Sequence, residues 1–338
     1  MKKKFLYGVW ALMGLSLGAS AQSMHFSQYY NAPMLLNPAN TALLPEHDYR
    51  IGTNYRNQWA SVPVPYSTFS LYTDMQVIKS DEKFNCFGIG FALFTDRAGD
   101  GLLSLTRGEA NLAYHLQMGQ SSILSLGGSV GYVQRSLNYD RLTYDFQWNG
   151  ETFSPSNPNG ELNGVIKTNY ATVGVGLSYS YFNDVVFLKF SGGVNNVNQP
   201  KESFYGTGIN ELGMRPTGNL DFIIKVASNV IVNPSVFYAN QKGAYELMYG
   251  TLFRFNITPD NDRPTQFIIG GYHRMGDAAV GAMGLQWNNF QFMANYDHTI
   301  SKLGPYNRGK GAMEFSIIYQ GVYPSSPQNR RTLGCPRF

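Results

Sequence analysis

The sequence has few charged residues and no long apolar run after its first 21 positions. Asp, Glu, Lys and Arg make up 14% of the 338 residues, against about 25% in soluble domains. Past residue 21 no stretch of about 18 apolar residues occurs, which excludes a membrane-spanning helix. The low charge argues against an ordinary secreted β-protein, which is the alternative for an exported chain without such a helix.

No complete catalytic or metal-binding pattern stands out. The five histidines are scattered without metal-ligand spacing, and the chain has neither a phosphate-binding loop nor a Cys-x-x-Cys pair. We expect no catalytic, cofactor-binding or metal-binding residues. A lipid hydrolase, which needs only a Ser and a His at a lipid-facing surface, is the enzymatic alternative.

Export is predicted by the first 21 residues. Three lysines, Lys2 to Lys4, precede the apolar stretch 5–17 and the small-x-small triplet at residues 19–21, which has the form of a signal-peptidase site. We expect residues 1–21 to be the signal peptide, cleaved between Ala21 and Gln22. The junction lacks a cysteine, which argues against a lipoprotein. Removing the three lysines lowers the net charge from +4 to +1, so no nucleic-acid surface is expected.

Large apolar residues recur at every second position in many short segments. Between residues 244 and 257 they are Tyr245, Leu247, Tyr249, Phe253, Phe255 and Ile257. The intervening positions include Glu246, Arg254 and Asn256. Because successive side chains of a strand point to opposite faces, such a segment has one face suited to lipid and one polar face. Repeated through the chain, the pattern is typical of a transmembrane β-barrel.

Fourteen strands can be counted, and bacterial barrels have an even number. We expect an all-β fold, an antiparallel transmembrane β-barrel of the outer membrane at residues 47–320. The expected strands are 48–58, 66–77, 86–95, 102–116, 122–137, 169–181, 185–195, 218–227, 230–239, 244–257, 265–273, 278–287, 289–298 and 310–320. If the chain starts in the periplasm, the odd-numbered connections face outward. These include the longest ones, at 138–168, 196–217 and 299–309, while most inward connections are short.

Alternation also predicts which charged side chains face the lumen. They include Arg50, Arg56, Asp74, Glu246, Arg254 and Glu314. Both signs are mixed, whereas a pore that selects one type of ion would carry one dominant sign. We therefore expect a filled lumen, with a narrow open channel as the alternative, because fourteen strands enclose more space than eight. The segment 22–46 is too rich in Pro and Asn for a strand, and we expect it to plug the lumen or to lie at the periplasmic end.

The two cysteines of the chain are expected on the same, periplasmic side. Cys86 opens the third strand after an inward connection, and Cys335 lies in a periplasmic C-terminal tail at residues 321–338. In an oxidising compartment the two thiols could pair and clip the tail to the barrel rim. The other interpretation is a buried free Cys86 and an unpaired Cys335.

Three connections rich in polar and aromatic residues are expected at the outer end, at 59–66, 96–100 and 298–308. Aromatic and arginine side chains dominate the energetics of protein interfaces, so a partner would bind here. The candidate residues are Trp59, Tyr66, Asp96, Arg97, Asp297, His298, Lys302, Tyr306 and Arg308. The plainer interpretation makes Trp59 an interfacial belt residue and 298–308 a solvated loop.

Several short motifs along the mature chain resemble one known family. They are residues 25–33 (His-Phe-Ser-Gln-Tyr-Tyr-Asn-Ala-Pro), 36–39 (Leu-Asn-Pro-Ala), 56–59 (Arg-Asn-Gln-Trp), Asp297 with 301–304 (Ser-Lys-Leu-Gly), 311–316 (Gly-Ala-Met-Glu-Phe-Ser) and 335–338 (Cys-Pro-Arg-Phe). In order and spacing they resemble the PorP/SprF family, outer-membrane components of the type IX secretion and gliding machinery of Bacteroidota.

The resemblance implies a barrel without enzymatic activity or cofactor that works with the type IX translocon. Its implied partners are translocon, periplasmic ring or motor-linked subunits and the C-terminal domain of a secreted adhesin, within outer-membrane lipid. It would help a cargo adhesin to be secreted and held at the surface, or join the ring, and both roles stay open. The alternative function is a passive channel for small or hydrophobic solutes.

Overall fold

The computed structural model describes residues 26–59, 66–80, 84–157, 164–204, 210–258, 265–302 and 304–324. The predicted signal peptide, with the junction between Ala21 and Gln22, lies outside these residues. So does the tail beyond residue 324, including Cys335.

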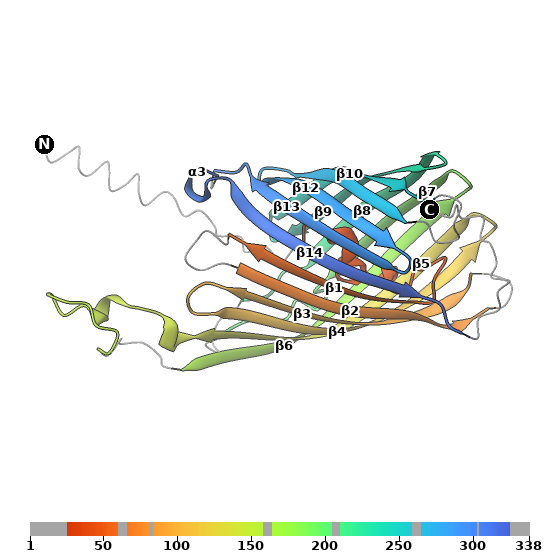
Figure 1. Cartoon of the computed structure of the whole chain (residues 1–338). Helices are drawn as coiled ribbons and strands as arrows, with labels where there is room; N and C mark the ends of the chain where they lie inside the picture. Colours follow the sequence, from red (N-terminus) through yellow and green to blue (C-terminus); the bar gives the residue numbers. More distant parts are fainter. Residues whose placement is uncertain are drawn as a thin grey trace, which may run out of the picture.

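The described residues contain fourteen β-strands that form the wall of the molecule (Figure 1). They are β1 Tyr49–Gln58, β2 Tyr66–Lys79, β3 Cys86–Ala98, β4 Leu103–Met118, β5 Ser122–Asn138, β6 Val165–Phe182, β7 Val186–Asn195, β8 Arg215–Ala227, β9 Val230–Gln241, β10 Ala244–Asn256, β11 Gln266–Arg274, β12 Ala278–Trp287, β13 Phe290–Thr299 and β14 Lys310–Gly321. Each strand pairs antiparallel with its neighbours in sequence, and β14 pairs with β1 to close the barrel. The predicted fourteen-stranded antiparallel barrel is confirmed.

The alternating sequence explains why these segments form a wall between lipid and lumen. In β4 the side chains of Asn111 and His115 are buried inside the barrel, while Leu112, Tyr114 and Leu116 are exposed on its outer face. Closure pairs every strand on both sides, so the backbone polar groups of the wall are satisfied without water, as a bilayer requires. No helix among the described residues is both long enough and apolar enough to cross a membrane.

Several strands are longer than the sequence pattern predicts. β6 begins at Val165 rather than at residue 169, β8 begins at Arg215 rather than at 218, and β3 continues to Ala98 rather than 95. The apolar alternation fades at these ends, but the backbone ladder continues, with Asn138 of β5 still opposite Val165. Pairing therefore extends past the hydrophobic band, because backbone groups are satisfied by a neighbouring strand whatever their side chains.

The two ends of the barrel differ in the length of their connections. The long connections β5–β6 and β7–β8 lie at one end, together with the β13–β14 connection, which contains the short helix α3 Gly304–Asn307 (Figure 1). The barrel rule of long outer loops and short inner turns assigns this end to the extracellular side. At the other end the chain enters β1, where the backbone N–H of Asp48 donates to the carbonyl of Gly321 at 2.8 Å.

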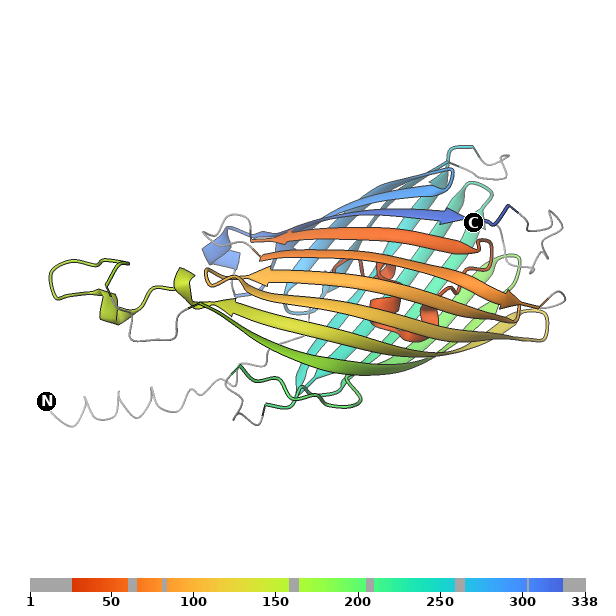
Figure 2. The same cartoon turned by 90° about the horizontal axis from the view of Figure 1, so that it is seen from below.

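The lumen is occupied by the chain itself. Residues 26–46 lie inside the barrel (Figure 2) and form three short helical turns, η1 Tyr29–Asn31, α2 Pro33–Leu36 and η2 Pro38–Asn40. Proline stands at the first position of α2 and of η2, where its missing N–H costs nothing and its fixed φ favours a turn. We call residues 26–46 the plug.

A charge placed on the middle of the lipid-facing wall should impair assembly. Phe315 lies halfway along β14 with its side chain 51% exposed, so Phe315→Lys should cost about 2–4 kcal/mol of folding free energy, because lysine is poorly solvated at mid-bilayer. Urea unfolding in lipid vesicles measures the loss. The matched control is Ile257→Lys, just after the end of β10, which should cost about 1 kcal/mol or less. Equal losses at both positions would contradict the assigned depth.

Candidate functional site: a plugged lumen and an extracellular rim

The outer end of the plug is held by an ion-pair network of the wall. The backbone N–H groups of Ser27 and Gln28 donate to the two carboxylate oxygens of Glu314, at 2.6 and 2.8 Å. The hydroxyl of Ser27 donates to Asp297 at 2.6 Å. Arg56 pairs with both carboxylates, 3.0 Å from that of Asp297. The network joins β1, β13 and β14 through the plug.

A second guanidinium extends this network. Arg274 of β11 lies 3.2 Å from Glu246 and 3.4 Å from Asp297, and it also donates to Ser27. These side chains are less than 10% exposed. Burying charges is costly unless each is paired and hydrogen-bonded. The plug supplies donors that the wall alone lacks, so the network and the plug stabilise each other.

An aromatic cluster seats the next part of the plug against β9 to β11. Tyr29 stacks on Phe237 with ring centroids 5.1 Å apart, and Tyr30 stacks on Tyr272 at 5.6 Å. The Tyr29 hydroxyl lies 2.6 Å from the hydroxyl of Ser235. Burial raises the pKa of Tyr29 well above its ordinary value, so the phenol stays protonated. On this side of the lumen the plug is packed against the wall by aromatic rings.

Glycines of the wall allow the middle of the plug to approach the strands closely. A Cβ at Gly127 would lie 2.3 Å from the backbone nitrogen of Ala39, and a Cβ at Gly176 would lie 1.7 Å from the side-chain oxygen of Asn37. The amide of Asn37 donates to the carbonyls of Leu177 and Gly192, at 3.0 and 2.9 Å. The plug is thus bonded to β6 and β7 at a place where no side chain intervenes.

The inner end of the plug is fixed to β2 and β4. The backbone N–H of Ala42 donates to Asp74 at 2.6 Å, and Arg50 pairs with the same carboxylate at 2.6 Å. His115 Nε2 lies 2.8 Å from the carbonyl oxygen of Thr41 and therefore carries the proton that it donates. Among the described residues, wall contacts thus hold the plug at its outer end, its middle and its inner end.

The structure places all six charges expected in the lumen on the inner face. Arg50, Arg56, Asp74, Glu246 and Glu314 have the partners given above, and the Arg254 guanidinium contacts Gln286 at 3.4 Å. Asp297 was expected on the outer rim, and that placement is wrong. Its side chain is 1% exposed, because position 297 shares the inward face of β13 with Asn295.

The remaining rim residues divide into exposed and half-buried ones. Arg97, His298, Lys302, Arg308 and Tyr66 are exposed at the extracellular end. Trp59 is half-buried, and its ring packs edge-on against Tyr66 at 5.1 Å. Asp96 is also half-buried and accepts a hydrogen bond from Thr68 at 2.6 Å. Tyr306 lies in α3. The exposed rim is therefore mainly cationic.

The structure describes only one of the two cysteines that were predicted to pair. Cys86 is a buried thiol at the periplasmic start of β3, and Cys335 lies outside the described residues. Pairing of the two stays a prediction.

Contrary to the expectation from the sequence, one catalytic-type pattern does occur in the chain, and the structure explains it. Residues 127–131, Gly-Gly-Ser-Val-Gly, match the Gly-x-Ser-x-Gly pattern of a hydrolase elbow, which needs a sharp strand-to-helix turn. In the barrel they lie in the middle of β5 and pair with β4 and β6. His115 bonds Ser125 at 2.7 Å rather than Ser129, and it is fully buried under Thr41. Among the described residues no cluster of three or more His, Cys, Asp or Glu could hold a metal ion.

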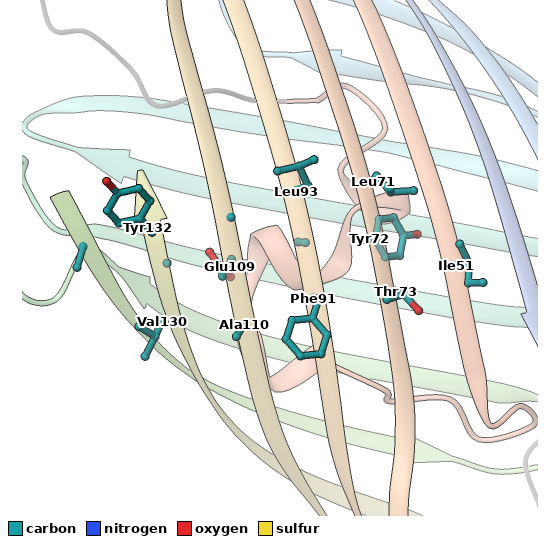
Figure 3. Close-up of a pocket in the computed structure, with 14 residues that line it drawn as sticks. Ile51, Leu71, Tyr72, Thr73, Phe91, Leu93, Glu109, Ala110, Val130 and Tyr132 are labelled. Carbon is teal, nitrogen blue, oxygen red and sulfur yellow. The ribbon is translucent and has the colours of Figure 1, made fainter. Parts of the chain in front are cut away.

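A hollow of about 870 Å³ lies against the wall formed by β1 to β6 (Figure 3). Most of its lining consists of lipid-facing apolar side chains, among them Leu71, Phe91, Leu93 and Val130. Between these side chains lie small residues such as Ala110, which leave space at the surface of the wall. The hollow therefore belongs to the lipid-facing surface and is not a binding site for a polar solute.

The sequence matches a family model over residues 18–319, and the model describes the type IX secretion system membrane protein PorP/SprF. The chain belongs to the PorP/SprF family. The resemblance carried by the short motifs is thereby confirmed, and the closed barrel fits an outer-membrane component of that secretion system. No curated protein matches the sequence.

Solved structures with a similar fold are outer-membrane barrels. The toluene transporter TbuX of Ralstonia pickettii is 11% identical, with a TM-score of 0.51 over 87% of this chain and 94% of that chain. The toluene transporter TodX of P. putida is 9% identical, with a TM-score of 0.51 over the same shares. A FadL homologue of Pseudomonas aeruginosa is 9% identical, with a TM-score of 0.50 over 86% and 94%. At these identities the likeness shows a similar fold alone.

Filling the space at Gly127 should unseat the plug. Gly127→Val puts a Cβ against the backbone of Ala39, and neither backbone can move aside cheaply. We expect faster proteolysis of the plug and higher single-channel conductance in planar bilayers. The control Gly128→Val points to the lipid side, where the nearest atom to a Cβ is 3.9 Å away. It should behave as the unsubstituted protein. The same conductance for both variants would contradict a close seat at Gly127.

Removing the central guanidinium of the network should destabilise the barrel. Arg56→Ala leaves Asp297 without its nearest cation and Glu314 without any cation, and breaking a buried pair in this way costs about 3–5 kcal/mol. Urea unfolding of the protein in vesicles gives the change in the free energy of unfolding. The exposed Arg308→Ala serves as control and should change it by about 0.5 kcal/mol or less. A loss at position 56 no larger than at 308 would mean that the network is dispensable.

Proposed function

We propose that this barrel is a docking subunit of the type IX secretion system and not a conduit. Its extracellular rim binds a secreted cargo protein through the cargo's C-terminal domain and holds it at the cell surface. Its periplasmic end is the face available to translocon or ring subunits. Held adhesins would serve gliding where the cell moves by this machinery.

One observation carries the proposal: the plug is bonded to the wall at its outer end, its middle and its inner end. Hydrogen bonds from Ser27, Asn37 and Ala42 join it to strands on different sides of the lumen. A channel for polar solutes would need a solvated path, and an enzyme would need an exposed reactive group in a cleft. A plugged barrel leaves its loops and its two ends as the surfaces through which it can act.

The rim supplies side chains suited to binding a protein. Arg97, Lys302 and Arg308 are exposed on the β3–β4 and β13–β14 sides of the extracellular end, and Tyr66 stands beside Trp59. Arginine and aromatic side chains contribute most to interface energetics. An acidic or polar surface of the cargo domain would complement the three cations.

A passive channel is the competing function, and conductance separates the two. The similar transporters share only the fold with this chain, so they do not favour a channel here. Liposome swelling or bilayer recordings on the purified protein should show little conductance for a docking subunit. Steady conductance with the plug intact would contradict the proposal.

Removing the rim cations should lower display of cargo at the cell surface. We expect Arg97→Ala, Lys302→Ala and Arg308→Ala together to leave the barrel folded, as heat-modifiable migration on gels shows, and to reduce the cargo retained on cells. The control removes equal charge at the same end of the barrel but away from the β3–β4 and β13–β14 connections, with Lys167→Ala, Lys201→Ala and Lys242→Ala, all exposed. Surface-labelling mass spectrometry measures retention. Normal retention in the rim variant would move the binding site away from these cations.

A further inference from the structure

At the apex of the β5–β6 loop a polar side chain is buried and large apolar side chains are exposed. Among residues 144–157, which we call the aromatic knob, the polar side chain of Gln147 is 5% exposed, whereas Phe146 is 77%, Trp148 54% and Phe153 46% exposed. A loop that stabilised itself by burying its apolar side chains would show the reverse. Exposed clusters of large apolar side chains on a soluble surface mark interaction sites.

Hydrogen bonds to Gln147 hold the aromatic knob in shape. Its side-chain oxygen accepts from the backbone N–H of Tyr144 at 2.9 Å, and its amide donates to the carbonyl of Pro155 at 3.0 Å. Its backbone carbonyl accepts from the backbone N–H of Ser154 at 3.0 Å and from the amide of Asn157 at 3.1 Å. The knob is therefore organised around a satisfied polar centre.

A tight hairpin turn presents the rings. Trp148 and Phe153 form an antiparallel bridge, and the side chain of Asn149 accepts from the backbone N–H groups of Glu151 and Thr152, at 3.0 and 2.7 Å. Because the rings stand on a fixed scaffold, a partner that covers them would lose little conformational entropy in ordering the loop.

The base of the loop is anchored to the barrel. The N–H of Asn138 donates to the carbonyl of Gly101 at 2.8 Å, the N–H of Tyr139 donates to Gly164 at 2.9 Å, and Asp140 accepts from the N–H of Gly164 at 2.7 Å. In both views the loop projects past the extracellular end of the wall, roughly along the barrel axis (Figures 1 and 2). The loop therefore carries the aromatic knob beyond the wall at the extracellular end.

The charge around the rings favours a protein over an anionic lipid surface as the binding partner. Asp145 and Glu151 flank them, both are exposed, and no salt bridge among the described residues involves either carboxylate. An anionic lipid surface would repel this edge. A protein groove with an apolar floor and a basic rim would complement it.

We propose that the aromatic knob is the docking element for a secreted protein that presents an apolar groove with a basic rim. This inference rests on the proposed function, and it moves the main contact from the cationic rim to the loop beyond it. The rings supply the buried centre of the interface, where a few aromatic side chains carry most of the binding energy. The two carboxylates orient the partner.

The first experiment compares the effect of losing the rings of the knob with the effect of losing the whole protein. Native cells carrying the full chain, a deletion strain, a ring variant (Phe146→Ser, Trp148→Ser, Phe153→Ser) and a control (Thr143→Ala, Ser156→Ala) are compared by mass spectrometry of surface and medium. Some secreted proteins should be lost from the surface of the deletion strain. We expect the amount of these proteins retained on the surface to fall about tenfold or more in the ring variant. In the control variant the retained amount should not change. Heat-modifiable migration verifies that each barrel is assembled.

The outcomes distinguish the two hypotheses. If the deletion strain retains all its secreted proteins, the proposed function fails. If the deletion strain loses a protein that the ring variant keeps, the proposed function stands and the knob inference is wrong. The conservative variant Trp148→Phe, made alone, should keep normal retention, because it leaves an apolar ring on the same scaffold.

A direct contact test uses the secreted protein that the deletion identifies. A photo-crosslinking side chain at position 148 should give an adduct with that protein in native membranes. Adducts with lipid only, or with a second copy of this chain, would overturn the proposal. Binding of the purified secreted protein to the full-length barrel should weaken with Asp145→Asn and Glu151→Gln and should lose most of its salt dependence. An unchanged salt dependence would overturn the basic-rim assignment.

Discussion

Every other feature of this molecule depends on the pairing of β14 with β1. Tyr49 lies opposite Gly321, and Gln58 lies opposite Ala312, so the first and last strands leave no free edge. In lipid an unpaired edge would expose polar backbone groups to hydrocarbon, which only closure avoids. Closure at fourteen strands in turn fixes an interior too wide for wall side chains to fill, and the chain fills it with its own N-terminal segment.

The plug and the wall are therefore one structure and not a barrel with an added part. Ser27 and Gln28 donate to carboxylates that Arg56 and Arg274 also contact, so neither the charges nor the plug would be satisfied alone. Glycines at positions 127 and 176 give the plug room to reach the wall. With the lumen occupied, the proposed binding of a secreted protein falls to the loops, where the cationic rim and the aromatic knob are the candidate surfaces.

Much of the fold could be read from the sequence because a strand in a bilayer has few options. Alternation at residues 244–257 predicted β10, and the mixed signs of the inward charges favoured a filled lumen. Strand ends were less predictable, as at Val165, because the adjacent apolar residues Val165 and Ile166 do not alternate with polar ones, although their backbone groups still pair in the ladder. Asp297 was misplaced for a different reason. The expected strand 289–298 already contained it, but it was grouped with the polar loop that follows, although its position puts it on the inward face with Asn295.

The sequence by itself determined the barrel, its number of strands and the face of most wall residues, because each follows from a period of two and a bilayer of fixed thickness. Only the tertiary structure decided which charges meet across the lumen. Arg56 and Asp297 are 241 positions apart, and no local pattern relates them. The same holds for the aromatic knob, where composition alone would place Phe146 and Trp148 inside and Gln147 outside. The reverse arises because Gln147 lies at the centre of the loop, where it forms hydrogen bonds with Tyr144, Pro155 and Asn157.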